Sequence, residues 1–303
     1  MMFAGNGESS VEVKVLDLRT DLAVEAKRLW EDSAEETTEL PGVIARKTQR
    51  RGIAVEKVVI RNEQGADALK KPVGTYLTVD LHPFAEKERH CFRRTALVLA
   101  EALRDLLAPF SSVLIAGLGN REITPDAIGP LVLEHILVTR HLLDRAKLPA
   151  GSLTPVSTVV PGVLGITGIE SVELVRSARE IVGADCVLVV DALASCEPER
   201  LCESVQLSDT GLIPGSGVGN SRPAFTNREL GVPVYAVGVP TVVDGATFLM
   251  RSGIPSEKNA IDLILTPRDI DSRVREIGKL IGYGIDLALQ PRLTFDDIPQ
   301  FLS

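Results

Sequence analysis

Cysteine is scarce in this sequence, and its spacing forms no metal-binding or redox motif. The chain has four cysteines among 303 residues, and no two of them make a C-x-x-C pair. One of them stands within an apolar, β-branched run that is typical of a buried strand. This usage fits a reducing compartment and argues against a fold held by disulfide bonds. The four residues are Cys91, Cys186, Cys196 and Cys202.

Positive charge, aromatic residues and long apolar runs are also in short supply. Only 4% of the residues are aromatic, the formal net charge is −8 and the pI is near 5.2. A protein that binds nucleic acid or an anionic membrane needs Lys and Arg gathered on one face. The basic cluster of this chain, at residues 46–51, is only local. No run is long enough to span a membrane, and MMFAGNGESS lacks the basic and apolar regions of a secretory signal. We therefore expect neither nucleic acid nor membrane as a partner.

Several catalytic motifs are missing. The glycine-rich stretch around Ser216 reads G-S-G-V-G, which is not the G-x-S-x-G turn of a serine hydrolase. The four histidines form no H-E-x-x-H zinc motif. Gly117 and Gly119 could begin a dinucleotide fingerprint, but Glu122 occupies the place of its third glycine. The sequence therefore predicts no cofactor and no bound metal.

What the chain does contain is alternating apolar strands and amphipathic helices. These predict an α/β fold, a doubly wound and mostly parallel sheet with helices on both faces. Strands are expected over 113–116, 155–160, 186–190, 204–207 and 234–239, and helices over 86–107, 126–143, 169–182 and 267–289. Earlier, period-two alternation predicts strands over 43–47, 53–61 and 74–81. We expect a small N-terminal β-rich subdomain, residues 22–85, before an α/β core of residues 86–303.

The most informative stretch is SSVLIAGLGNREITPDAIGP, residues 111–130. An apolar strand leads into a glycine turn, and Thr124, Pro125 and Asp126 then have the pattern of a helix start. An acid at that position is stabilised by free backbone N–H groups and by the helix dipole. The pattern therefore presents a carboxylate beyond the end of a central strand, where open α/β sheets place their sites.

A second acid, Asp191, directly follows the apolar run 186–190. If the two strands are parallel neighbours, Asp126 and Asp191 emerge at the same edge of the sheet. Two nearby carboxyl groups share a proton, so one can activate water while the other assists the carbonyl oxygen or the leaving amine. Each acid also has a purely structural interpretation, Asp126 as a helix-stabilising residue and Asp191 as a cap at a strand end.

Other residues near this edge are candidates for binding substrate. The glycine-rich loop 215–220 could offer backbone N–H groups to a substrate carbonyl or could be only a tight turn. Asp244 could line the cleft or cap a helix. The predicted substrate-binding residues are Gly119, Asn120, Gly215, Ser216, Gly217, Thr241 and Asp244.

Taken in order, several segments resemble those of one family. They are RTDLAVEAK at 19–27, AGLGNREITPDAIGP at 116–130, LVTRHL at 137–142, PVSTVVPGVLGITGIE at 155–170, VVDALAS at 189–195, QLSDTGLIPGSGVGN at 206–220 and VGVPTVVD at 237–244. Together they make the chain similar to the spore germination proteases, the endopeptidases that degrade small acid-soluble spore proteins.

The resemblance implies a fold like that of the hydrogenase-maturation proteases and two essential acids, Asp126 and Asp191. It implies a zymogen that assembles as a homotetramer and acts in the spore core, a cytoplasmic location. Family substrates carry a Thr-Glu-hydrophobe-Ala-Ser-Glu-like site that is cut after the first acid, and TDLAVE at residues 20–25 imitates it. The implied processing site is the Asp21–Leu22 bond, which would release residues 1–21 as a pro-segment.

Two alternatives remain open at this point. A nickel-dependent maturation protease on a similar fold would need metal ligands, such as a carboxylate pair with a histidine. A non-catalytic α/β protein could instead use the glycine turns to hold an anion or another ligand. The first predicts activity that depends on nickel, and the second predicts saturable binding without peptide cleavage.

Overall fold

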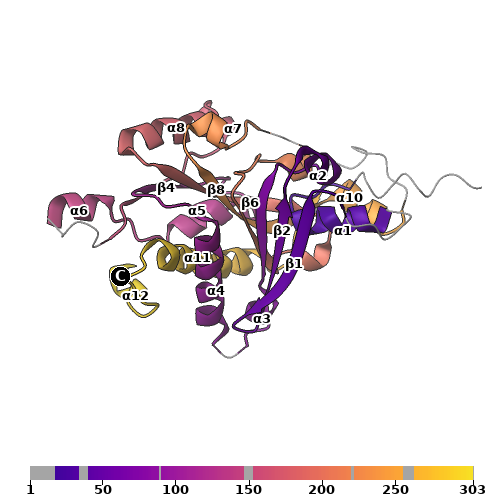
Figure 1. The fold of residues 1–303 in the computed structure, drawn as a ribbon, viewed down its shortest axis with the longest axis horizontal. Coiled ribbons are helices and arrows are strands. Elements are labelled where there is room, and N and C mark those ends of the chain that lie inside the picture. Colours follow the sequence, from indigo (N-terminus) through magenta and orange to yellow (C-terminus); the bar gives the residue numbers. More distant parts are fainter. Residues whose placement is uncertain are drawn as a thin grey trace, which may run out of the picture.

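The structure is a computed structural model that describes residues 18–33, 40–88, 90–146, 153–219, 222–254 and 263–302. Most of the predicted pro-segment, residues 1–17, lies outside the described residues. One nine-stranded sheet runs through the described part in the order β1-β2-β3-β7-β8-β6-β4-β5, and β9 pairs with β8. Helices cover both faces of this sheet (Figure 1).

The side of the sheet from β8 to β5 is parallel. Its strands are β4 (Val113–Gly117), β5 (Val156–Val159), β6 (Cys186–Ser195) and β8 (Val234–Asp244). They are rich in Val, Ile and Leu because both faces are buried: in β6, Leu188 lies in one hydrophobic core and Val189 in the other. The predicted α/β fold with a mostly parallel central sheet is confirmed.

An antiparallel extension continues the same sheet. β7 pairs with β8 on one side and with β3 on the other, and β2 and β1 follow as antiparallel neighbours. These strands are β1 (Val43–Arg50), β2 (Ile53–Ile60), β3 (Gly74–Asp80) and β7 (Ser204–Ser208), with β9 (Ile264–Leu265) at the end of β8. The predicted boundary after residue 85 thus falls within a continuous sheet, and the division into domains remains a prediction.

Two long helices cover one face of the sheet. α4 (Cys91–Leu106) and α11 (Ile270–Leu289) pack on each other and, with α5 (Ile128–Leu133), bury the larger hydrophobic core. The approach is close, since a Cβ atom added to Gly284 of α11 would lie 2.9 Å from Leu99 Cβ of α4. The interior glycines of α11 therefore allow close packing against neighbouring helices.

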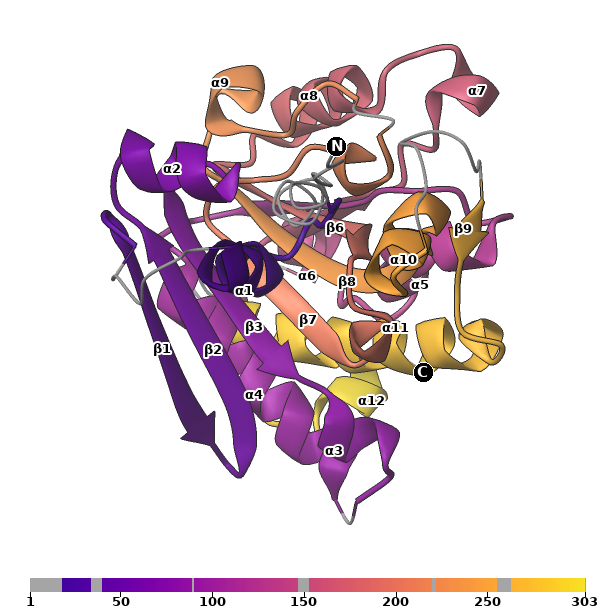
Figure 2. The same ribbon diagram turned by 90° about the vertical axis from the view of Figure 1, so that its right-hand side faces the viewer.

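The other face has two groups of helices. α8 (Ser171–Val182) and α9 (Asn227–Leu230) lie together over the parallel strands, and α1 (Ala23–Ser33) and α2 (Glu63–Leu69) cover the extension (Figure 2). The shorter helices are α3 (His82–Ala85), α6 (Arg140–Ala146), α7 (Leu164–Thr167), α10 (Gly245–Arg251) and α12 (Ile298–Leu302), with single 3-10 turns η2 (Thr124–Asp126), η3 (Pro198–Arg200) and η4 (Ser216–Val218). Within the described residues, no helix has the length and apolarity of a membrane span.

The prediction of one continuous helix over 126–143 is wrong. It is divided into η2, α5 and α6, and Thr124 is not its N-cap. The break has a tertiary cause: the backbone N–H of Leu137 donates to both carboxylate oxygens of buried Asp286, at 3.0 and 3.1 Å. The N–H of Thr139 donates to the Val156 carbonyl, so these groups are not free to continue a helix. The helix predicted from residue 86 also begins later, at Cys91.

Two central strands extend further than the sequence indicates. β6 continues through Asp191 to Ser195, and β8 continues to Asp244, because the two strands stay paired past a register shift between Leu193 and Ala194. Thr241 falls in this irregular stretch of β8. Asp191 is therefore inside a strand and not at the residue that follows one.

Candidate active site

A cleft of about 620 Å³ opens over the central strands, and both predicted acids line it. β4 and β6 are parallel neighbours, so η2, which follows β4, lies against β6 near Asp191. The predicted residues on the walls of this cleft are Asp21, Gly119, Asp126, Asp191, Gly215 and Thr241. The structure therefore brings together residues from five separate parts of the sequence.

Asp126 is held by the glycine turn that precedes it. The backbone N–H of Asn120 donates to its carboxylate at 2.7 Å. Gly119 has a φ of +100°, and a Cβ atom there would lie 2.0 Å from the Asp126 carbonyl oxygen, so only glycine fits. Gly119 and Asn120 thus position Asp126. Burial raises the pKa of the Asp126 carboxyl, and the hydrogen bond from Asn120 partly opposes that rise.

Asp191 lies deeper, with 5% of its surface exposed. Its carboxylate accepts a hydrogen bond from the backbone N–H of Ala192 at 2.9 Å. Burial raises the pKa of Asp191 well above its usual range, and repulsion from Asp126 and from Asp21 raises it further. The pKa of Asp191 is thus raised more strongly than that of Asp126. This is the arrangement that general acid–base chemistry requires.

Asp21, from the predicted processing site, is bound in the same cleft. Its carboxylate accepts hydrogen bonds from the backbone N–H of Ala194 at 2.8 Å and from the Ser216 hydroxyl at 2.5 Å. Its own N–H donates to the Ala194 carbonyl at 2.9 Å. Leu22, the other half of the predicted site, does not line the cleft and is fully buried in a core with α2 and β2. The Asp21–Leu22 bond thus joins a residue in the cleft to a residue in the core.

The loop 215–219 contacts this segment instead of standing free. Gly217 packs against Asp21, and a Cβ atom on it would lie 2.4 Å from an Asp21 carboxylate oxygen. The guanidinium of Arg19 donates to the Val218 carbonyl at 3.4 Å and lies 3.6 Å from the Asp244 carboxylate. Ser216 and Gly217 therefore bind the chain's own N-terminal segment in this structure.

Thr241 and Asp244 have different surroundings. Thr241 is fully buried and lines the cleft, and within the described residues its hydroxyl has no hydrogen-bond partner. Asp244 is the N-cap of α10: its carboxylate accepts from the Thr247 N–H at 3.0 Å and from the Thr247 hydroxyl at 2.9 Å. The helix-cap interpretation of Asp244 is thus the one that the structure supports.

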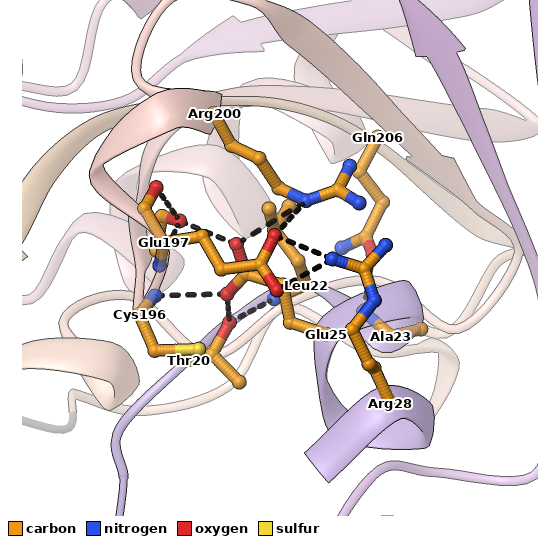
Figure 3. Close-up of polar contacts among 10 residues, drawn as sticks. Thr20, Leu22, Ala23, Glu25, Arg28, Cys196, Glu197, Arg200 and Gln206 are labelled. Carbon is orange, nitrogen blue, oxygen red and sulfur yellow. Dashed lines mark hydrogen bonds and ion pairs between the residues drawn. The ribbon is translucent and has the colours of Figure 1, made fainter. Parts of the chain in front are cut away.

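Sequence reasoning missed the polar residues that anchor the segment 20–25 (Figure 3). Glu25 is fully buried and accepts hydrogen bonds from the Cys196 N–H and the hydroxyls of Thr20 and Ser195. Gln206 of β7 donates to the Asp21 carbonyl at 3.0 Å and accepts from the Ala23 N–H at 2.7 Å. An acid in the first turn of a helix is common on the surface, so nothing local in the sequence signals that Glu25 is buried.

Lys71 is another residue that the sequence did not single out. Its ammonium donates to the Thr20 carbonyl at 3.0 Å. Burial lowers the pKa of Lys71, and the nearby charges of Asp21 and Glu25 oppose that fall. Among the described residues, no three His, Cys, Asp or Glu side chains converge in a way that could hold a metal ion.

The comparisons with known proteins agree with the motifs. The model of the Peptidase_A25 family, described as germination protease, matches residues 21–252. A germination protease of Caldanaerobacter subterraneus subsp. tengcongensis is 40% identical over 325 residues, covering 95% of this chain and 99% of the relative. One of Clostridium perfringens is 37% identical with the same coverage, and one of Bacillus cytotoxicus is 37% identical over 93% of this chain and 77% of the relative.

Among solved structures, a [NiFe] hydrogenase maturation protease of Thermococcus kodakarensis KOD1 aligns with 61% of this chain and 98% of its own, at 19% identity. Its TM-score of 0.36 is too low to establish a common fold. The family model and the relatives, in contrast, cover most of the sequence, including both cleft acids and the segment after Asp21. The chain therefore belongs to the germination protease family of peptidases.

Proposed function

We propose that the chain is an endopeptidase made as a self-processing zymogen, and that Asp126 and Asp191 cleave the peptide bond by activating water. The observation that carries the proposal is that both carboxyl groups line one cleft and have raised pKa values of different degree. Two acids whose environments separate their pKa values are the usual acid–base pair of a hydrolase. The proposed substrates are small acid-soluble spore proteins in the spore core.

The mechanism assigns one role to each acid. Ionised Asp126 takes a proton from a water molecule, whose oxygen forms a bond with the substrate carbonyl carbon. Protonated Asp191 first donates a hydrogen bond to the carbonyl oxygen as it gains negative charge. Both acids are now protonated. The C–N bond then breaks, and one of the two acids gives its proton to the leaving amine. No covalent enzyme intermediate is needed, and the pair ends with the one proton that it had at the start.

The same pair is proposed to remove residues 1–21 by cutting the Asp21–Leu22 bond. The position of Asp21 in the cleft supports this, together with its effect on the pKa of Asp191. In the resting chain, Leu22 is buried and the Asp21 carbonyl is bound by Gln206. Cleavage therefore requires the segment to shift, which accounts for a latent zymogen. Assembly as a homo-oligomer, a tetramer by resemblance to the family, is part of the proposal.

The test uses a peptide that contains Thr-Glu-Phe-Ala-Ser-Glu and the chain from which residues 1–21 have been removed. Asp126→Asn and Asp191→Asn are compared with wild type and with Glu180→Gln, a matched control on the exposed face of α8. Cleavage after the first Glu, retained in the control, lost in both Asp variants and indifferent to a chelator, supports the proposal. Cleavage that survives either Asp substitution, or that chelator abolishes, contradicts it.

A further inference from the structure

Asp21 is bound as a substrate residue would be bound, through its main chain and its side chain together. Its N–H donates to the Ala194 carbonyl at 2.9 Å, and its carbonyl accepts from Gln206 at 3.0 Å. Its carboxylate oxygens receive one donor each, the Ser216 hydroxyl on Oδ1 and the Ala194 N–H on Oδ2. Every polar group of this residue is thus bound by β6, β7 or the loop 215–219.

The shape of the site also fits an acid. Gly217 faces the Asp21 carboxylate so closely that a Cβ atom would lie 2.4 Å from Oδ2 and 2.5 Å from the Ala194 Cβ atom. The glycine is therefore needed for space and not for backbone freedom, since its φ lies outside the left-handed range. A side chain at position 217 would fill this space and keep a carboxylate away from its two donors, the Ser216 hydroxyl and the Ala194 N–H.

Charge favours an acid at this position as well. Lys71 is held against the segment by its hydrogen bond to the Thr20 carbonyl at 3.0 Å, and its charge interacts with that of Asp21. When residues up to Asp21 leave, the Ala194 N–H and the Ser216 hydroxyl lose their acceptor. The Gln206 amide loses the Asp21 carbonyl but keeps the Ala23 N–H, and Lys71 loses the Thr20 carbonyl and the nearby charge of Asp21. Buried donors without partners are costly, so a ligand that restores these bonds is favoured over one that cannot.

We propose that this site, formed by Ala194 N–H, Ser216, Gly217 and Lys71, is the specificity pocket for the acidic residue that precedes the scissile bond of the substrate. Asp21 occupies it in the zymogen and vacates it on processing. The inference rests on the proposed peptidase function, because it assigns the substrate subsite of the same cleft. It names the side chains that select Asp or Glu over a neutral residue.

The first arm of the test does not depend on cleavage. In an Asp126→Asn background, which blocks processing, the melting temperature of the full chain is measured for Asp21→Asn, Ser216→Ala and the double variant. We expect Asp21→Asn to lower the melting temperature when Ser216 is present, and to lower it less when Ser216 is absent. An unchanged melting temperature in Asp21→Asn overturns the acid pocket, whatever the catalytic result.

The second arm uses the processed chain and two peptides that differ only in Glu or Gln before the cleaved bond. Ser216→Ala and Lys71→Met are each expected to lower the ratio of kcat/KM for Glu over Gln by about tenfold or more. The first removes a donor to the carboxylate, and the second removes a positive charge that interacts with it. Ser272→Ala and Lys57→Met, at exposed positions on α11 and β2, are matched controls that keep the ratio.

Gly217→Ala gives an independent variant, because its added methyl group competes with the acid for space. It is expected to reduce cleavage of the Glu peptide and the Gln peptide alike, because the two side chains have nearly the same size. A Glu-to-Gln ratio that is unchanged in Ser216→Ala and Lys71→Met overturns the pocket while leaving the peptidase intact. Absence of cleavage of both peptides by the wild-type processed chain contradicts the proposed function itself.

Discussion

Asp21 and Ser216 are separated by 195 positions in the sequence, yet the Ser216 hydroxyl donates to the Asp21 carboxylate at 2.5 Å. Asp21 also contributes to the raised pKa of Asp191, after burial and the charge of Asp126. The segment that is proposed to be removed is thus linked both to the loop 215–219 and to a cleft acid. Its departure changes the electrostatics of the site as well as its accessibility.

The first prediction concerns the two cleft acids. Asp191→Asn removes a buried acid whose pKa is raised by burial and repulsion, so the variant should be as stable as wild type at pH 7, or more stable. Peptide cleavage should nevertheless fall by about 10²–10⁴-fold, because the general acid is lost. Thermal unfolding and kcat measured on one preparation separate these effects. Parallel loss of stability and activity would indicate a structural role for Asp191.

The second prediction concerns pH. In the proposed mechanism activity requires protonated Asp191, so it should fall as the pH rises through the pKa of that group. Asp21 is one cause of the raised pKa, so its removal shifts this limb of the pH profile to lower pH. The alkaline limb of kcat/KM for peptide cleavage reports the free processed chain, before a substrate acid enters the site. It should therefore lie below the alkaline limb of self-processing by the full chain. A limb at the same pH in both reactions would contradict the coupling between Asp21 and Asp191.

The third prediction concerns Gly119. Gly119→Ala places a Cβ atom 2.0 Å from the Asp126 carbonyl oxygen at a φ of +100°, so it should displace Asp126 and lower kcat. Gly168→Ala is the control, because Gly168 also has a positive φ, +70°, but nothing lies within 4 Å of the added atom. Both variants carry the backbone strain of about 1–2 kcal/mol, and only Gly119→Ala should lose activity. Equal kcat values for the two variants would show that Gly119 does not position Asp126.

The fourth prediction concerns Asp286, which is fully buried and receives the Leu137 N–H. Burial raises its pKa from 3.8 to about 7. The unfolded chain therefore binds fewer protons between these pH values, and the stability due to this group is lost as the pH rises through that window. Asp286→Asn should gain stability over wild type across the same window, on the order of 4 kcal/mol at most. Asp296→Asn, an exposed change, should show no such trend in denaturant unfolding.

The local sequence pattern was enough to predict the strands that are buried on both faces of the sheet. β4 and β6 are continuous apolar runs, and such runs are typical of buried parallel strands. The break between α5 and α6 could not be predicted, because its cause is Asp286, 149 positions beyond Leu137. The extension of β6 to Ser195 likewise depends on its pairing with β8 past an irregular register. These features are set by tertiary contacts and leave no periodic signal in the local sequence.

The residues of the cleft were also predicted only in part. The sequence placed Asp126 and Asp191 at one edge of the sheet only on the condition that their strands are parallel neighbours. In the structure β4 and β6 are parallel neighbours, and both acids line one cleft. Lys71 and Glu25 could not be found in this way, since a lysine before a proline and an acid early in a helix are ordinary surface features. Their contacts depend on how the segment 20–25 folds onto β6 and β7.

The most direct test of the account is the intact mass of the full chain after activation, measured for wild type, Asp126→Asn and Asp191→Asn. The account predicts that wild type loses residues 1–21 and begins at Leu22, and that both variants keep their full mass. A new N-terminus at another residue, or processing at Leu22 in either variant when it is incubated alone, would contradict self-cleavage by the paired acids.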